Sequence, residues 1–370
     1  MYGPAYGHNI ETFIAYFQHH NNKYDVDFVY TGDDLFARDK KYSALNFIKI
    51  ALYPNLIIKL IFLIRKRPDL MWVHASNIYY LLFLNFFRSK KTILNINIWS
   101  EKIPRLAAGN SFKGKLWKYI LGKADYVQCN WYGTQKLINE IVDSKTVVFP
   151  WGLHEDYFND TNKAVSKIAQ DFIEDLPKDK IKFFYPKSIT FASDHTAVVD
   201  AVYELVQKQT TNFIVYFWMG NILDKKMELT LRAKISQLKL DDYIRIEQHD
   251  YISYSDIKYV WSRMDVGMQI AIFDQFSTSV IEPMLMKKEL IITKIDPYIK
   301  LNELYPNISL KLIERNAVNI SREMNNYILG EKSSDIILND RARMVEEEFN
   351  FNENLEKMLL FYEGLTKNKS

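Results

Sequence analysis

Two carboxylic acids stand eight positions apart in the stretch from Asp265 to Asp296, where the sequence is richest in potential chemistry. Asp274 follows an apolar run, and Glu282 lies inside a second one. An acid with apolar neighbours more often faces a cleft than bulk water, and there it can accept hydrogen bonds from a ligand. Between the two acids lie three hydroxyl residues, Ser277, Thr278 and Ser279. Hydroxyl side chains suit the start of a helix, whose free amide groups can bind phosphate.

The spacing of the apolar residues predicts the elements that position these acids. Residues 266–271 are apolar enough for a buried strand, residues 279–286 repeat at helical spacing, and residues 290–293 predict a second strand. Together they form one βαβ unit, whose loop falls at the carboxyl edge of a parallel sheet, where open α/β sheets bind ligands. The alternative is a solvated loop followed by an acid that only stabilises the helix dipole.

The composition indicates a globular protein of two domains. The chain has 370 residues, 48% of them hydrophobic, which is too long for one core. Its net charge of +3 is unevenly divided, because residues 1–150 contain 20 Lys and Arg but only 11 Asp and Glu. A basic first half predicts contact with something anionic. The single cysteine, Cys129, cannot form an internal disulfide, which is typical of a reducing cytoplasm.

Several functions find no support in the sequence. There is no Cys/His cluster with zinc spacing and no P-loop. The polar N-terminus does not resemble a signal peptide, and the most apolar run, residues 56–64, is far shorter than the ~20 residues that span a bilayer. Basic residues near Arg65 and Lys115 lack interleaved aromatic signatures for nucleic acid, so a lipid surface is favoured as their partner.

The remaining sequence alternates between predicted strands and helices. In the first half we expect helices over residues 10–20, within 42–67 and over 113–122 and 131–142, with strands at 25–30, 70–74, 91–97, 126–129 and 146–149. Turn residues at 150–158 then interrupt this alternation of strands and helices. We therefore predict a first domain of residues 1–152, a linker of 153–179, a second domain of 180–348, and a terminal helix and tail of 349–370.

Several strings resemble the retaining glycosyltransferases of family 4, bacterial surface-polysaccharide enzymes with the GT-B fold. Their donor site typically reads E-G-F-G-x-x-x-x-E-A-M-A, and residues 274–285 read DQFSTSVIEPML, so both acids and Phe276 match. RPDLMWVH at 67–74 and PWGLHEDYF at 150–158 are similar to two further family segments. The resemblance implies an α/β protein of two Rossmann-like, doubly wound domains facing a cleft. It also implies a C-terminal helix, near residues 352–364, that crosses back to the first domain.

The resemblance also assigns roles to residues. Glu282 would hold the ribose hydroxyls, Asp274 would hydrogen-bond the donor sugar, and Lys187 would neutralise the leaving diphosphate in place of the family's arginine. Glu101 matches the acid of a loop that could face the acceptor. Further candidates for donor binding are Phe276, Ser277, Thr278, Ser279, Tyr251, Ile252 and Gly7. The family's second basic residue is absent. Ser193 and His195 stand near its place, which implies that histidine or backbone dipoles replace it.

The function that the resemblance implies is transfer of a sugar, with retention, from a nucleotide sugar to a saccharide acceptor, including lipid-linked saccharides. No metal or other cofactor and no nucleic-acid partner are expected. The missing loop glycines and second basic residue leave two alternatives open: a GT-B module that binds ligand without catalysis, and a nucleotide-sugar epimerase. We expect a cytoplasmic protein whose basic region at residues 47–67 associates peripherally with the anionic inner face of the plasma membrane.

Overall fold

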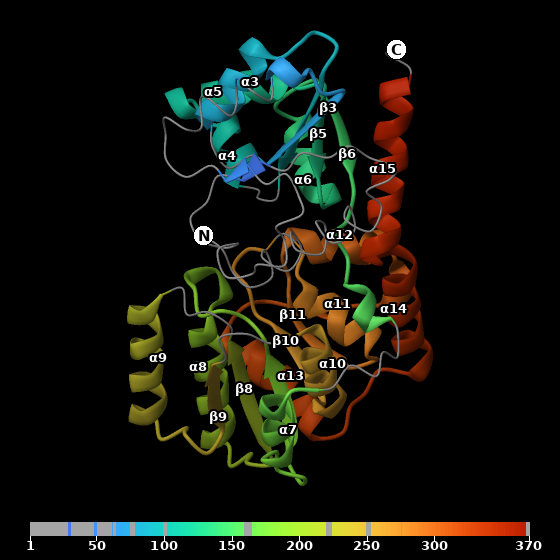
Figure 1. Cartoon of the computed structure of the whole chain (residues 1–370). Helices are drawn as coiled ribbons and strands as arrows, with labels where there is room; N and C mark the ends of the chain where they lie inside the picture. Colours follow the sequence, from blue (N-terminus) through green and yellow to red (C-terminus); the bar gives the residue numbers. More distant parts are fainter. Residues whose placement is uncertain are drawn as a thin grey trace. The chain divides into compact units, whose positions relative to one another are not determined.

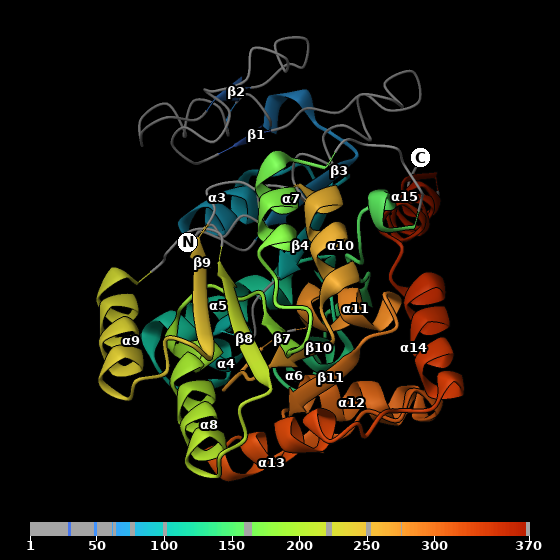
Figure 2. The ribbon, with the colours of Figure 1, turned by 90° about the horizontal axis from the view of Figure 1, so that it is seen from below.

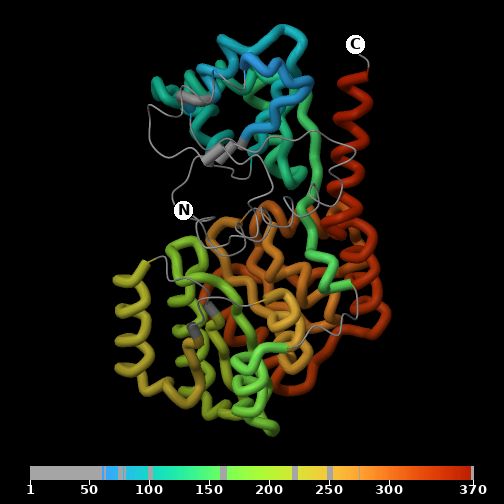
Figure 3. The backbone as a smooth tube through the Cα atoms, viewed as in Figure 1, coloured from blue at the N-terminus to red at the C-terminus, as the bar shows by residue number. Residues whose placement is uncertain are grey.

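The computed structural model describes residues 29–30, 48–49, 61, 64–74, 78–98, 102–158, 165–219, 224–248, 253–274 and 276–367. The chain divides into two compact units (Figures 1 and 3). Unit 1 comprises residues 1–149 and 356–370, and unit 2 comprises residues 150–355. Each unit is built around a parallel sheet, so the chain has the α/β fold of two parallel-sheet domains that was predicted.

Unit 1 contains a four-stranded parallel sheet whose strands follow one another in chain order. The strands are β3 (Leu70–His74), β4 (Ile93–Ile98), β5 (Tyr126–Cys129) and β6 (Lys145–Val148). The connecting helices are α3 (Ile78–Phe87), α4 (Lys102–Ala108), α5 (Phe112–Lys123) and α6 (Tyr132–Asn139). Every second residue of β4, namely Leu94, Ile96 and Ile98, packs into one core with α3 and α5. The alternation follows from the two-residue period of a strand, which turns these three side chains to one face.

The other face of this sheet carries polar side chains and meets the last helix, α15 (Phe351–Lys367). Gln128 Oε1 accepts hydrogen bonds from Trp72 Nε1 and from the Tyr362 hydroxyl, both at 2.8 Å. The Gln128 Nε2 atom lies 3.3 Å from the Met358 sulfur. These contacts place the C-terminal part of α15 in unit 1, as expected of the terminal helix.

Unit 2 contains a six-stranded parallel sheet in the order β12-β11-β10-β7-β8-β9. Its strands are β7 (Ile181–Tyr185), β8 (Phe213–Met219), β9 (Ile244–Gln248), β10 (Val266–Gln269), β11 (Glu289–Thr293) and β12 (Leu312–Ile313). The order reverses between β7 and β10, so this sheet is doubly wound. Ligands of doubly wound sheets bind outside the carboxyl ends of the strands at such a switch point.

Helices cover both faces of the unit 2 sheet (Figure 2). They are α7 (Lys167–Glu174), α8 (His195–Gln207), α9 (Lys225–Gln237), α10 (Tyr254–Arg263), α11 (Thr278–Leu285), α12 (Asp296–Leu304), α13 (Ala317–Ile328) and α14 (Asp335–Glu348). Along β7, Phe183 and Tyr185 face the apolar layer of α8, α9 and α13. Phe184 between them faces the layer of α7 and α10. The side chains of β7 from Phe183 to Tyr185 meet apolar residues on both sides of the sheet, which explains why this part of the strand lacks an alternating polar pattern.

Some predictions for the first half differ from the structure or lie outside the described residues. Residues 48–49 were expected to be helical but form a short strand, β2 (Ile48–Lys49), which pairs in parallel with β1 (Val29–Tyr30). Strand pairing with a distant segment here overrides local helical spacing. The helix predicted for residues 10–20 and most of residues 42–67 lie outside the described residues. Within the part of the chain that is described, no helix is long and apolar enough to cross a membrane.

Gly152 lies where the chain enters unit 2 and adopts a φ of +68°. A Cβ at this position would stand 2.2 Å from the Phe349 carbonyl oxygen, which accepts a hydrogen bond from Leu153 N–H at 2.6 Å. We expect Gly152→Ala to lower the free energy of unfolding by about 2–4 kcal/mol, because backbone strain and a backbone clash add. Urea unfolding monitored by circular dichroism measures this loss.

Gly330→Ala is the matched control for this prediction. Gly330 also has a positive φ, +91°, but a Cβ there would meet no atom within 4 Å. Its replacement should cost only the strain of the left-handed backbone, about 1–2 kcal/mol. Equal losses in both variants would contradict the clash with Phe349.

Candidate functional site

Two loops of unit 2 meet at the switch point, one after β7 and one after β10. The Tyr185 hydroxyl, at the end of β7, lies 3.0 Å from the Ile270 carbonyl and also bonds to the Ser193 carbonyl. The Ile272 N–H donates to the Ala192 carbonyl at 2.8 Å. Burial raises the pKa of Tyr185 well above 10, so its phenol keeps the proton that it donates. The two loops are therefore held together by a buried donor and a backbone bond.

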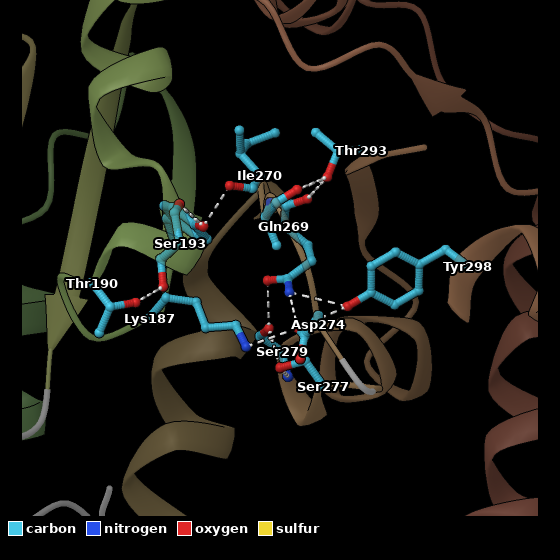
Figure 4. A network of polar contacts seen from close by, with 12 residues as sticks. Lys187, Thr190, Ser193, Gln269, Ile270, Asp274, Ser277, Ser279, Thr293 and Tyr298 are labelled. Carbon is cyan, nitrogen blue, oxygen red and sulfur yellow. Dashed lines mark hydrogen bonds and ion pairs between the residues drawn. The ribbon is translucent and has the colours of Figure 1, made fainter. Parts of the chain in front are cut away.

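Lys187 and Asp274, both predicted as site residues, are in contact between these loops (Figure 4). The Lys187 Nζ lies 3.0 Å from Asp274 Oδ2, and the two side chains are 23% and 17% exposed. Partial burial shields this ion pair from solvent, so it is stronger than a pair on the open surface. The residues lie 87 positions apart in sequence. They meet because β7 and β10 are neighbours in the sheet.

Gln269 and Tyr298 also hold Asp274, and neither was predicted as a site residue. The Tyr298 hydroxyl donates to Asp274 Oδ2 at 3.1 Å, and Gln269 Nε2 donates to the same oxygen. Gln269 Nε2 also lies 3.0 Å from the Tyr298 hydroxyl oxygen, and both side chains are fully buried. Asp274 is therefore fixed in one orientation by three donors. The Gln269 amide inside the otherwise apolar run 266–271 was a usable sequence signal, whereas nothing in the sequence pointed to Tyr298.

The serines predicted to bind the donor are part of the same network. Ser277 caps α11 by accepting from the Ser279 N–H at 3.3 Å, and the two hydroxyls are 2.7 Å apart. The Ser279 hydroxyl donates to Gln269 Oε1 at 2.9 Å. Both serines are buried, whereas Thr278 is exposed. The side chains of Ser277 and Ser279 therefore stabilise the loop itself, and Thr278 is the exposed residue of the three.

Phe276 anchors the loop at a second point. Its ring stacks on Phe349 at the end of α14, with a centroid distance of 4.8 Å and an angle of 22°. The Tyr298 ring lies 6.4 Å from it on α12. The aromatic residue that matches the family motif thus has aromatic partners within the protein, and its contribution to the site is to fix the loop that carries Asp274.

Glu282 lies one turn into α11 on its buried side, 8% exposed. Trp261 Nε1 donates to Glu282 Oε2 at 2.9 Å. The Tyr157 hydroxyl lies beside the carboxylate, and burial together with the Glu282 charge raises the pKa of this phenol. Burial likewise raises the pKa of the Glu282 carboxyl, against the hydrogen bond from Trp261 and the charge of Lys187. Glu282 is thus within electrostatic reach of the Lys187–Asp274 pair.

His195 begins α8 and is buried between two aromatic rings. Its ring centroid lies 4.6 Å from that of Tyr185 and 4.8 Å from that of Phe217. Burial lowers the pKa of His195 to about 3, so the ring is neutral at pH 7. His195 therefore cannot supply the positive charge of the missing second basic residue. Of the two substitutes predicted from the sequence, only backbone dipoles remain.

The low pKa of His195 predicts that the protein loses stability in acid. Below the ordinary value near 6.5, the unfolded chain binds a proton that the folded chain does not bind until about pH 3. Between those values this residue alone should lower the free energy of unfolding by up to about 1.4 kcal/mol per pH unit as the pH falls. His195→Gln cannot take up this proton, so its stability should change less between pH 6.5 and 4.5. Urea titrations that give both proteins the same pH dependence would contradict the burial of a neutral histidine.

Four predicted site residues lie outside the described residues: Glu101, Tyr251, Ile252 and Gly7. Their roles toward acceptor and donor remain predictions. The structure therefore brings together Lys187 and Asp274, places Glu282 nearby in the same unit, and adds Gln269 and Tyr298 as their supports.

The fold defined by these two sheets is that of the GT-B glycosyltransferases. A glycosyltransferase from Rickettsia africae ESF-5 is similar with a TM-score of 0.75 at 18% identity, over 99% of this chain and 96% of its own. HepE from Anabaena, solved in complex with UDP, gives a TM-score of 0.64 at 12% identity, over 84% and 82% of the two chains. Sucrose-phosphate synthase from Thermosynechococcus elongatus gives 0.65 at 14% identity, over 85% and 78%. No protein-family model matches the sequence, and no curated protein matches it.

Proposed function

We propose that this protein transfers a glycosyl group from a nucleotide-sugar donor to a saccharide acceptor. The observation that carries the proposal is the Lys187–Asp274 pair at the switch point of a doubly wound sheet, with Glu282 in the helix that follows. Two further facts support it. The chain shares its fold with glycosyltransferases, and HepE has been solved with UDP and with UDP-glucose.

Lys187, Asp274 and Glu282 of unit 2 have different roles in the proposed reaction. As the bond between the anomeric carbon and the phosphate oxygen breaks, its electron pair moves onto the diphosphate, and Lys187 neutralises the growing charge. The acceptor hydroxyl forms the new bond to the anomeric carbon and gives its proton to the leaving diphosphate oxygen. Asp274 accepts hydrogen bonds from the donor sugar, and Glu282 accepts them from the ribose hydroxyls. The positive charge comes from lysine and helix amides, so the proposal includes no metal ion.

The Lys187–Asp274 bond gives the site a defined resting state. Asp274 holds the Lys187 ammonium at the carboxyl end of β7, while Gln269 and Tyr298 keep Asp274 in place. An arriving diphosphate competes with Asp274 for the lysine. Since the donors from Gln269 and Tyr298 are neutral, they continue to hold the carboxylate when Lys187 turns to the phosphate.

The finer parts of the proposal rest on the sequence motifs. They are retention at the anomeric carbon, membership of family 4, a lipid-linked saccharide among the acceptors, and a role in bacterial surface-polysaccharide synthesis. A cytoplasmic location and peripheral association with the plasma membrane complete the proposal.

A donor screen followed by a turnover assay tests the function. Nucleotide sugars that raise the melting temperature of the purified protein are incubated with it, with and without saccharide acceptors. We expect nucleotide release that depends on the acceptor. Donor isomerised without acceptor would indicate an epimerase, and donor binding without turnover on any acceptor would indicate a binding module. A protein stabilised by no nucleotide sugar would contradict the donor site altogether.

A further inference from the structure

Helix α5 belongs to unit 1, and Figure 1 shows its course. We call the exposed side of this helix the α5 face. It consists of two aromatic and four basic residues: Phe112, Lys113, Lys115, Lys118, Tyr119 and Lys123. Phe112 is 83% exposed and Tyr119 is 45% exposed. The opposite side of the helix, including Trp117 and Ile120, is buried in the core of unit 1.

Helical geometry places both rings on the outermost line of α5. At about 100° per residue, Phe112, Lys115, Tyr119 and Lys123 fall within one narrow sector opposite the buried Trp117. The Lys123 ammonium lies 5.9 Å from the centre of the Tyr119 ring, which confirms that these two side chains share a side. Phe112 is not part of the apolar core that the described residues of unit 1 form, so packing among those residues does not account for a phenylalanine in this sector.

The charge of this surface has a single sign. From Lys102 to Lys123 the sequence contains six basic residues and no acidic one. Among the described residues, no carboxylate forms a salt bridge with Lys113, Lys115 or Lys118. Exposed lysines beside exposed aromatic rings can bind an anionic membrane surface through their charge, while the rings enter its headgroup boundary.

The end of α3 extends the same region with two more exposed rings. Phe86 is 68% exposed and Phe87 is 60% exposed. Arg88, which follows them, donates to the Lys123 carbonyl at 3.3 Å. The exposed end of α3 therefore lies next to the last turn of α5.

We propose that the α5 face docks unit 1 on an anionic lipid bilayer. Its lysines pair with headgroup phosphates, and Phe112 and Tyr119 enter the boundary between headgroups and acyl chains. Each lysine near an anionic surface strengthens binding about fivefold, equivalent to about 1 kcal/mol. This inference rests on the peripheral membrane association in the proposed function and gives it a surface. That surface includes Lys115, for which the sequence favours a lipid partner, and lies outside residues 47–67.

The shape of the α5 face favours a bilayer over nucleic acid. Single-stranded nucleic acids bind in positively charged grooves with aromatic platforms for successive bases. Here the rings stand on the convex ridge of a surface helix, and all four basic residues of the face are lysines. A ridge of this kind fits a planar headgroup layer, into which its rings can be inserted.

Sedimentation with vesicles tests the proposal on the full chain. We expect binding to vesicles of 70% phosphatidylcholine and 30% phosphatidylglycerol at low salt, and little binding to phosphatidylcholine alone. The triple variant Lys113→Glu, Lys115→Glu, Lys118→Glu should bind the anionic vesicles at least 50-fold more weakly. The double variant Phe112→Ser, Tyr119→Ser should lose the part of the binding that persists in 0.5 M salt.

A matched charge control separates this surface from net charge. Lys226, Lys239 and Lys332 are exposed lysines of unit 2, and their joint replacement by glutamate changes the net charge by the same amount. This variant should keep most of the vesicle binding. An equal loss of vesicle binding in both triple variants would overturn the assignment to α5. The assignment would also be overturned if the unmodified protein bound a single-stranded RNA but did not bind anionic vesicles.

A labelled cysteine reports insertion directly. The natural Cys129 is buried, so Phe112→Cys introduces an accessible thiol for an environment-sensitive fluorophore. Leu229→Cys, on α9 of unit 2, is the control because Leu229 is 59% exposed. Anionic vesicles should shift the emission of the label at position 112 to the blue and leave that at position 229 unchanged. No shift at position 112, or the same shift at both positions, would overturn the proposal.

Discussion

Replacing Lys187 by alanine is expected to lower kcat for sugar transfer by about 100- to 1,000-fold. This is the usual loss of rate when one preorganised hydrogen-bond donor to a developing negative charge is removed. The charge on the diphosphate grows as the glycosyl bond breaks, so the interaction with Lys187 is stronger in the transition state than in the bound donor. The KM for the donor should therefore rise much less than kcat falls. Steady-state kinetics with the identified donor measure both effects.

Lys182 provides the matched control for Lys187. Both lysines belong to the β7 segment and both form ion pairs, Lys182 with Asp265 at 2.9 Å and Lys187 with Asp274 at 3.0 Å. Lys182 stands at the amino end of the strand, far from the switch point. Lys182→Ala should leave kcat within about twofold of the parent. A Lys187→Ala protein in which only the KM for the acceptor changes would assign Lys187 to a different site.

Glu282→Ala is expected to abolish detectable transfer, and Glu282→Gln is expected to weaken donor binding by about 10- to 150-fold. A carboxylate that accepts hydrogen bonds from a ribose diol contributes on the order of 1.5–3 kcal/mol, and an amide keeps only one acceptor oxygen. Glutamine can still accept from Trp261, which preserves the buried bond that glutamate makes at 2.9 Å. Titration calorimetry with the nucleotide alone measures the loss without requiring turnover.

The stability of Glu282→Gln gives an independent check. Burial raises the pKa of the Glu282 carboxyl, so the fold disfavours its charged form. A neutral amide avoids that cost, and we expect the variant to unfold at a urea concentration no lower than the parent at pH 7. Glu289→Gln is the control, because Glu289 is a buried acid at the amino end of β11 that accepts from Ser333. The Glu289→Gln change should lower the free energy of unfolding and leave the nucleotide affinity unchanged. Unchanged kinetics in a folded Glu282→Ala protein would exclude Glu282 from the donor site.

The sequence by itself determined the local structure around the acids. Apolar spacing predicted a strand, a helix and a strand from residue 266 to residue 293, and these are β10, α11 and β11. It also predicted that Lys187 follows a strand, which is β7. These features depend on residues within a few positions of one another, because the two-residue period of strands and the 3.6-residue period of helices are local.

The tertiary structure alone decided which of these residues meet. Lys187 reaches Asp274 because β7 lies beside β10 in the sheet, and strand order depends on pairing between segments far apart in sequence. Tyr298 joins them from α12, and burial between aromatic rings makes His195 neutral. Exposure is equally non-local. The sequence predicted a helix over residues 113–122, but only the packing of unit 1 shows that the helix begins at Phe112 with its ring in solvent. Contacts and burial depend on which elements pack together, and a strand's own residues do not specify its neighbours.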